Sequence, residues 1–423
     1  MPVKGLLAEL GARGLVHDST DGGALAALLD AKSTGVYVGF DPTADSLHVG
    51  HLMGQISLRR FQLAGHRPFP LAGGATGMVG DPSGRSDERN LLDRETLQHN
   101  VDRIKHQLEN LLDFGAGANA ATLVNNADWT VGVTALDFLR DVGKHVTINQ
   151  MTAKESVRNR LNSENGLSYT EFSYMLLQAN DFRHLCASND VELQMGGSDQ
   201  WGNITVGIDL IRRTLQRTAH GITWPLVTKS DGTKFGKTAD GAVWLDPART
   251  SPYQFQQFWV QMADDDIAKY LPRFSLASMD ECASVIDAHA ADPGRRNAQR
   301  FLADEMTTLV HGAPAARDAE AAAGVLFGGD PTTASREALA VVASEVPCTK
   351  VSRADLDDTF GLLARAQVVA STSEARRTVS QGGMKVNGAT LAEGETLASK
   401  GFLHDRWVLV RKGKTAYHLF DLS

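Results

Sequence analysis

Short apolar runs alternate with longer amphipathic stretches from about residue 36 to residue 228, and this alternation restricts the possible folds more than any other feature. The apolar runs are of the kind found in strands of a buried parallel sheet. They occupy residues 36–40, 68–72, 122–125, 191–195 and 222–227. The predicted covering helices occupy residues 49–64, 94–114, 134–142, 170–185 and 200–219. The pattern predicts the fold class α/β, with a Rossmann-like doubly wound parallel sheet whose ligands bind beyond the carboxyl ends of the strands.

Two histidines flank a glycine where the first strand gives way to a helix, in the sequence VYVGFDPTADSLHVGH. Asp45 or Ser46 can cap that helix, and His48 and His51 share one face of its first turn. A helix N-terminus favours an anion, and two neutral imidazole donors suit a phosphate whose negative charge grows during a reaction. Alone, the motif is also compatible with two helix-face histidines without a function, or with an incomplete metal site.

A second segment, TKSDGTKFGKT at residues 228–238, carries Lys229, Lys234 and Lys237 around a turn pair and a glycine. Taken alone, a solvated lysine-rich hairpin tip is the simplest interpretation. Together with the histidine pair, inside one alternating β/α pattern, the segment predicts a clamp that holds a polyphosphate from two sides.

Further polar residues follow the other predicted strands. The glycine-rich stretch at residues 73–85 fits neither a dinucleotide fingerprint nor a P-loop, so a surface loop is its simplest interpretation. The GGSDQ sequence at 196–200 allows close backbone approach, and Asp199 can either accept hydrogen bonds from a ribose or cap the next helix. Tyr174, Gln178 and Asp181 lie on one face of an otherwise apolar helix, which favours a polar pocket wall over a surface stripe.

Composition sets outer limits. With 423 residues, 42% hydrophobic and 22% charged, the chain is long enough for two or three ordinary globular domains. Three widely spaced cysteines indicate reduced thiols, and we find neither a signal-peptide pattern nor a membrane-spanning run, so we expect a cytoplasmic protein without a membrane partner. The net charge is −8, yet residues 350–423 carry 11 Lys and Arg against 8 Asp and Glu. A locally basic C-terminal module on an acidic body permits nucleic-acid binding.

The pattern changes along the chain in three places. We expect a catalytic domain at residues 1–250, a helical domain at 251–330, a linker at 331–349 and a small α+β domain at 350–423. The run of three aspartates at 264–266 is interpreted as a helix cap with solvated charges rather than a metal site.

Several stretches together resemble the bacterial tyrosyl-tRNA synthetases, which are class I aminoacyl-tRNA synthetases, over essentially the whole chain. These stretches are VGFDPTADSLHVGH, GGATGMVGDPSGR, YTEFSYMLLQANDF, GGSDQWGNI and DGTKFGKT. HVGH stands where the class has HIGH, and KFGKT stands where it has KMSKS, with glycine replacing the serine before the second lysine. The C-terminal stretch SEARRTVSQGGMKVNG is similar to the S4-like RNA-binding module of many bacterial members.

The resemblance implies a role for each candidate residue. Tyr37 and Asp181 would hold the phenolic hydroxyl of tyrosine. The α-ammonium group would be held by Asp81, Tyr174 and Gln178, with Thr76, Asn126 and Gln194 supporting them. The adenylate would contact Gly39, Asp41, Gly197, Asp199 and Gln200. Catalysis at the phosphates would use His48, His51, Lys234, Lys237 and Thr238, with Thr43, Arg85 and Arg89 as further ATP or pyrophosphate contacts. RNA phosphates would be contacted by Arg376, Arg377, Lys385, Arg411, Lys412 and Lys414.

The reaction implied has two steps: tyrosine attacks the α-phosphate of ATP, and the terminal ribose of tRNA(Tyr) then attacks the adenylate. A carboxylate is already a nucleophile at neutral pH, so catalysis would rest on positioning and on stabilising charge at phosphorus. Mg²⁺ would be bound through the ATP phosphates, without a protein-made metal site. The resemblance also implies a homodimer, with an insertion at about residues 125–170 in its interface.

Two alternatives stay open. One is another enzyme on this scaffold, either specific for tryptophan or acting on a small molecule. Tyr37 with Asp181 argues against tryptophan, because an indole offers only a donor, and the C-terminal module argues against a small-molecule enzyme. The other is a catalytically inactive synthetase-like RNA-binding paralogue, which would be expected to have lost motif residues that this chain retains.

Overall fold

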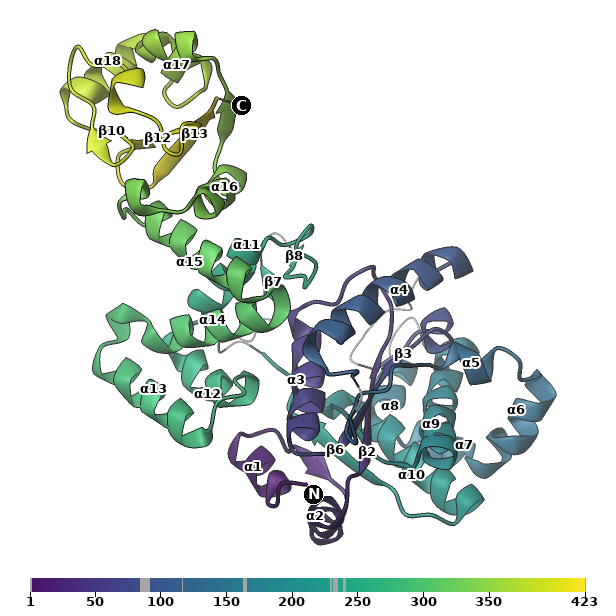
Figure 1. Ribbon diagram of the computed structural model, residues 1–423. Coiled ribbons are helices and arrows are strands. Elements are labelled where there is room, and N and C mark those ends of the chain that lie inside the picture. Colours follow the sequence, from purple (N-terminus) through teal and green to yellow (C-terminus); the bar gives the residue numbers. More distant parts are fainter. Residues whose placement is uncertain are drawn as a thin grey trace. The chain divides into compact units, whose positions relative to one another are not determined.

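The computed structural model describes residues 2–83, 92–115, 117–162, 166–228, 230, 235–238 and 241–422. Of Ser156, Lys237 and Thr238 it describes the backbone. The chain divides into two compact units (Figure 1). The first comprises Met1–Thr250 with Phe258–Val310, and the second comprises Ser251–Gln257 with His311–Ser423.

A six-stranded sheet lies at the centre of the first unit. Its spatial order is β1 (Asp18–Ser19), β6 (His220–Trp224), β5 (Val191–Gly197), β2 (Gly35–Phe40), β3 (Arg67–Ala72) and β4 (Val124–Asn125). Strands β2 to β6 run parallel, as predicted, and their positions agree with the apolar runs of the sequence. The sheet departs from the parallel pattern at one edge, where β1 pairs antiparallel with β6. With two polar residues, β1 leaves no hydrophobic pattern to detect.

The predicted covering helices are confirmed within a few residues. They are α3 (Val49–Leu63), α4 (Arg94–Leu111), α6 (Ala135–Asp141), α9 (Tyr169–Asn189) and α10 (Trp201–Leu215). Helices α9 and α10 pack together, and their buried side chains join those of β2, β3 and β5 in one apolar cluster. The remaining helices of this unit are α1 (Leu6–Ala12), α2 (Gly22–Ala31), α5 (Ala127–Thr130), α7 (Ile148–Thr152), α8 (Glu155–Leu161), α12 (Asp264–Phe274) and α13 (Met279–Ala291). Helices α11 (Pro252–Val260) and α14 (Asn297–His311) each include residues of both units.

The three consecutive aspartates form the first turn of α12, where their negative charges interact favourably with the helix dipole. The prediction of a solvated run is wrong for Asp266, which is buried and accepts the backbone N–H of Ser230. Asp264, in turn, accepts a hydrogen bond from Gln299 and contacts the ring of His289.

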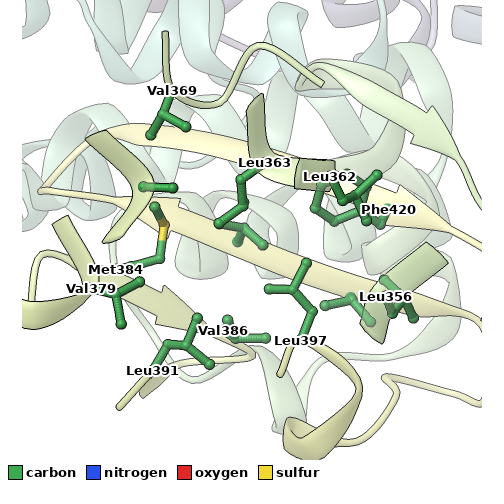
Figure 2. Close-up of a cluster of buried hydrophobic side chains, with 13 residues drawn as sticks. Leu356, Leu362, Leu363, Val369, Val379, Met384, Val386, Leu391, Leu397 and Phe420 are labelled. Carbon is green, nitrogen blue, oxygen red and sulfur yellow. The ribbon is translucent and has the colours of Figure 1, made fainter. Parts of the chain in front are cut away.

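The second unit is built on a five-stranded sheet with the order β11 (Ala389–Thr390), β10 (Met384–Val386), β12 (Trp407–Lys412), β13 (Ala416–Asp421) and β9 (Cys348–Lys350). Its helices are α15 (Ala313–Leu326), α16 (Arg336–Glu345), α17 (Thr359–Arg365) and α18 (Thr372–Ser380). Alternate residues of β12 and β13 face opposite sides of the sheet. Val408, Val410 and Phe420 join α17 and α18 in the core that Figure 2 shows.

On the other side of this sheet, Trp407 and Leu409 pack with α15 and α16 in a second apolar cluster. The segment at 331–349, expected as a linker, therefore contains a helix whose Leu339 and Val342 belong to this core.

Within the described residues, no helix combines the length and the apolar character that crossing a lipid bilayer requires. Cys186, Cys282 and Cys348 are free thiols, as their wide spacing predicts.

Candidate active site

The carboxyl ends of β2 and β5 border a cavity of about 310 Å³ in the first unit. Fourteen residues singled out from the sequence line it: Tyr37, Gly39, Asp41, Thr43, His51, Thr76, Asp81, Tyr174, Gln178, Asp181, Gln194, Gly197, Asp199 and Gln200. They come from separate strands, loops and helices, and the parallel sheet brings them together because its carboxyl ends share one edge. Of the other predicted residues, Arg85, Arg89 and Lys234 lie outside the described part of the chain.

Tyr37 and Asp181 form a buried polar pair in the wall of this cavity. The hydroxyl of Tyr37 has no hydrogen-bond partner among the described residues. The carboxylate of Asp181 accepts one bond from Asn126 Nδ2 and one from Trp129 Nε1, each at 2.9 Å. Burial raises the pKa of Asp181 to about 7, against the opposing effect of these two donors, and burial also raises the pKa of Tyr37. An orphaned hydroxyl beside a carboxylate suits a ligand hydroxyl that can both donate and accept.

Trp129 is a site residue that the sequence did not indicate. It lies in the four-residue helix α5, which is too short for a periodic pattern. Its ring stacks on His184 of α9, with centroids 4.4 Å apart. Trp129 of α5 therefore packs against α9, the helix that carries Asp181, whose carboxylate accepts its hydrogen bond.

Four carboxylates share the cavity. Asp41 accepts hydrogen bonds from Tyr174 Oη (2.7 Å) and Thr76 Oγ1 (2.8 Å). The amide of Gln200 donates to Asp81 (2.7 Å) and to Asp199 (3.1 Å). Burial raises the pKa of Asp199. The described residues that line the cavity include no lysine or arginine to balance these carboxylates. This excess of acceptors fits a cationic group such as an ammonium ion.

Asn203 is a second residue that sequence reasoning missed. Its amide donates to Gln178 Oε1 (2.9 Å) and to Gln200 Oε1 (3.2 Å), which fixes both amides with their oxygens as acceptors. Its position, three residues after Gln200 on a helix, is the signal that could have identified it.

The two histidines have a defined orientation. His48 is itself the N-cap of α3, so the prediction that Asp45 or Ser46 caps this helix is wrong. The backbone N–H of Gly50 donates to Nδ1 of His48 (3.0 Å), and that of His48 donates to Nδ1 of His51 (3.1 Å). A ring nitrogen that accepts carries no proton, so each neutral imidazole carries its proton on Nε2. The capping geometry therefore makes Nε2–H the donor of both rings at the helix N-terminus.

The described end of the lysine segment, residues 235–238, lies beside this helix start. Lys237 and Thr238 form β7, which pairs with β8 (Gly241–Ala242). Gly236 has a φ of +80°, and a Cβ there would lie 2.5 Å from Val49 Cγ2. Glycine in place of the class serine is thus explained by close approach to the HVGH turn.

The predicted RNA-binding cations lie on α18, on β10 and on and after β12 of the second unit. Lys385 and Arg411 are cross-strand neighbours and line one cavity of about 470 Å³. Arg376 lies over the ring of Phe360, and Lys412 forms an ion pair with Glu374 at 2.7 Å.

Comparison with known proteins shows the family of this chain. The family model described as "tRNA synthetases class I (W and Y)" matches residues 30–328. The chain belongs to this family. Residues 338–420 match the "Tyrosine--tRNA ligase SYY-like C-terminal domain".

Three relatives illustrate the similarity of this synthetase to characterised proteins. A tyrosine–tRNA ligase of Roseiflexus castenholzii is 49% identical, covering 99% of both chains. One of Opitutus terrae is also 49% identical, covering 97% of this chain and 98% of its own. The crystal structure of a C-terminally truncated Aspergillus nidulans mitochondrial tyrosyl-tRNA synthetase is 32% identical with a TM-score of 0.70, covering 77% of this chain and 95% of its own.

Proposed function

We propose that this synthetase activates L-tyrosine with ATP to tyrosyl-adenylate and then transfers tyrosine to the 3′-terminal ribose of tRNA(Tyr). Relatives named tyrosine–tRNA ligase match nearly the whole chain, and nothing favours an inactive paralogue. The observation that carries the specificity is the buried pair of Tyr37 and Asp181 in the cavity wall. Charging of tRNA(Tyr) by the purified protein, with tyrosine compared against tryptophan, tests the complete reaction.

In this proposal the phenol of tyrosine donates to Asp181 and accepts from Tyr37. Phenylalanine would leave both buried groups without a partner, which is costly. Tryptophan offers a donor but no acceptor, so the hydroxyl of Tyr37 would stay unsatisfied.

At the other end of the amino acid, Asp81, Tyr174 and Gln178 hold the ammonium group. Asn203 fixes the oxygen of Gln178 as an acceptor, and Gln200 joins Asp81 to Asp199. Asp199 and Gln200, with Gly39, Asp41 and Gly197, contact the adenylate. Because these hydrogen bonds link the two sets of residues, one network supports the binding of both the amino acid and the nucleotide.

The phosphates lie towards the start of α3. The Nε2–H groups of His48 and His51 stabilise charge that develops on the α-phosphate, and Thr43 lies near them. Lys234, Lys237, Thr238, Arg85 and Arg89 hold the departing pyrophosphate. We assign Mg²⁺ to the ATP substrate, because phosphate oxygens are ligands that this ion prefers.

Tyrosine binding is expected to weaken in mild acid. Burial raises the pKa of Asp181 to about 7, so below that pH the carboxyl becomes protonated and neutral, and it accepts the phenolic hydrogen bond more weakly. For one such group, KM for tyrosine should rise about tenfold between pH 8 and pH 6, and should be flat above pH 8. The measurement is ATP–pyrophosphate exchange at saturating ATP across this range.

The raised pKa of Asp181 also makes the stability of the fold depend on pH. A folded pKa above the unfolded value of 3.8 means that the stability contributed by neutral Asp181 is lost as the pH rises through about 7. A KM for tyrosine that is constant from pH 6 to pH 8, or that falls in acid, would contradict the assignment of Asp181 as an acceptor.

For tRNA, we propose that the second unit contacts phosphates through Arg376, Arg377, Lys385, Arg411, Lys412 and Lys414. Changing Arg377, Lys385 and Lys414 together to glutamine should weaken tRNA binding about tenfold near 0.15 M salt. The plot of log affinity against log salt should also become less steep, by about two in slope, because each lost phosphate contact no longer releases counterions.

The matched control is Lys400→Gln, because Lys400 lies in the same unit outside this set, forms an ion pair with Glu395 at 2.6 Å, and should leave the slope unchanged. Tyrosine-dependent pyrophosphate exchange, which needs no tRNA, should be unaffected in both proteins. An unchanged salt slope in the triple variant would show that these cations do not contact RNA.

We also propose a homodimer formed through the insertion at about residues 125–170. Large apolar side chains are exposed there: Val131, Val133, Leu136, Leu139 and Ile148. Apolar side chains gathered in one short stretch of the surface are characteristic of an interface, and a second copy of the chain is the proposed partner.

We also propose a cytoplasmic location, because the substrates tRNA and ATP are both available there.

The proposed domains are residues 1–250 for catalysis, 251–330 on the anticodon side, and 350–423 for RNA binding. Leu339 and Val342 of α16 pack with Trp407, so the intervening residues contribute to the fold of the RNA-binding part.

A further inference from the structure

One face of α12 contacts the lysine segment before and after residues 231–234, which lie outside the described part of the chain. Asp266, Tyr270 and Phe274 are spaced four residues apart, so they line up along one side of the helix. All three are buried. None of them borders the cavity at the carboxyl ends of the strands.

The arm that enters the segment is held by hydrogen bonds. The carboxylate of Asp266 accepts the backbone N–H of Ser230, at 3.0 Å to Oδ1 and 3.2 Å to Oδ2, and its hydroxyl at 3.3 Å. The hydroxyl of Tyr270 accepts the N–H of Thr228 (3.1 Å) and donates to the carbonyl of the same residue. Two backbone positions of the entering arm are thereby fixed by side chains of one helix.

The arm that leaves the segment is held by aromatic packing. Phe235 is buried, and its ring centroid lies 5.4 Å from Tyr270 and 5.5 Å from Phe274. Trp259 adds a further contact at 5.7 Å. Gly236 then carries the chain to Val49 at the start of α3.

The opposite end of α12 is fixed to α3 itself. Arg60, in the last turn of α3, donates to the carbonyl of Arg273 at 3.0 Å. Arg13 donates to the carbonyls of Ser275 (3.2 Å) and Ala277 (2.6 Å), just beyond α12. Cations at a helix C-terminus are favourable, and both arginines are buried there. The helix that begins with the histidine pair and the segment that carries the lysines are thus held by one common element.

We propose that α12 positions the lysine segment against the start of α3. In this proposal Asp266 and Tyr270 are positioning residues for the adenylation step. This inference rests on the proposed function, in which the lysines bind the ATP phosphates. Thr228 and Ser230 on one side and Phe235 on the other contact the same helix, so α12 fixes the described residues at both ends of the segment. Asp266 and Tyr270 act on the ATP-dependent step and leave the tyrosine pocket unchanged.

The test uses Asp266→Ala and Tyr270→Phe in the full chain. Each should lower kcat for tyrosine-dependent pyrophosphate exchange about tenfold, with the dissociation constant of tyrosine, measured without ATP, unchanged within twofold. Asp266→Asn keeps one oxygen acceptor for the Ser230 N–H and should recover part of the loss. Asp265→Ala is the matched control, because Asp265 is the exposed neighbour on the same helix.

Tyr270→Phe keeps the ring that packs on Phe235 and removes only the hydroxyl. The variant therefore tests the hydrogen bonds to Thr228 without changing the aromatic packing that stabilises the fold. Wild-type kcat in both Asp266→Ala and Tyr270→Phe, or an equal loss of tyrosine affinity and kcat, would overturn the proposal. If the unsubstituted protein shows no tyrosine-dependent exchange, the proposed function fails instead, and the two failures are distinct.

Discussion

Replacing Asp181 with asparagine is expected to lower kcat/KM for tyrosine about 100-fold in pyrophosphate exchange, while changing kcat/KM for phenylalanine little. A hydrogen bond to a buried charged group contributes up to about 3 kcal/mol, which corresponds to this factor. The amide would also turn a donor towards Asn126 or Trp129, which both donate to the carboxylate. Phenylalanine makes no bond to Asp181, so discrimination against it should collapse.

The matched control is Asp190→Asn, the same chemical change at the end of the same helix. Asp190 is exposed and has a φ of 54°, a conformation in which asparagine is well tolerated. Its exchange kinetics should equal those of the unsubstituted protein. Unchanged selectivity between tyrosine and phenylalanine in Asp181→Asn would refute the assignment of the phenol pocket.

Replacing His48 and His51 together with alanine is expected to lower kcat for exchange by at least about 1,000-fold. Removing one preorganised donor to a developing oxyanion typically costs 100-fold or more, and here two Nε2–H donors are lost. The dissociation constant of tyrosine in the absence of ATP should stay nearly constant, because Tyr37 and Asp181 do not depend on the imidazoles. Stopped-flow or exchange kinetics with saturating tyrosine and ATP measures the effect.

Loss of the helix cap must be separated from loss of the donors, because His48 Nδ1 also caps α3. His48→Asn serves this purpose, since an asparagine oxygen can accept the N–H of Gly50 and replace the cap. We expect the Asn variant to unfold at the temperature of the unsubstituted protein, and the Ala variant at a lower temperature. Full activity in the double alanine variant would show that the histidines do not stabilise the transferring phosphate.

Periodicity predicted the central sheet and its covering helices because both depend on which residues can be buried. β1 escaped prediction because it is two polar residues at a sheet edge. The buried position of Asp266 also escaped, since three consecutive aspartates suggest solvated charges, and burial depends on Ser230, which is distant in sequence.

The site residues were found for a different reason. The carboxyl ends of parallel strands share one edge of the sheet, so polar residues after separate strands can be assigned to one place before any contact is known. The roles of Tyr37, within a strand, and Asp181, within a helix, came instead from the resemblance to the synthetase family. Residues that orient other residues lack this signal. Trp129 is recognisable only from the hydrogen bond that it donates to Asp181, whereas Asn203, which donates to Gln178, could have been identified only from its helical spacing to Gln200. The N-cap function of His48 likewise depends on backbone geometry that the motif alone does not specify.

We propose that this synthetase recognises tyrosine by its phenol and adenylates its carboxylate. The most direct test is amino-acid-dependent ATP–pyrophosphate exchange without tRNA, run in parallel with tyrosine, tryptophan and phenylalanine. The account predicts exchange with tyrosine alone. Exchange with tryptophan or phenylalanine at a comparable rate, or no exchange from protein shown to be folded, would contradict it.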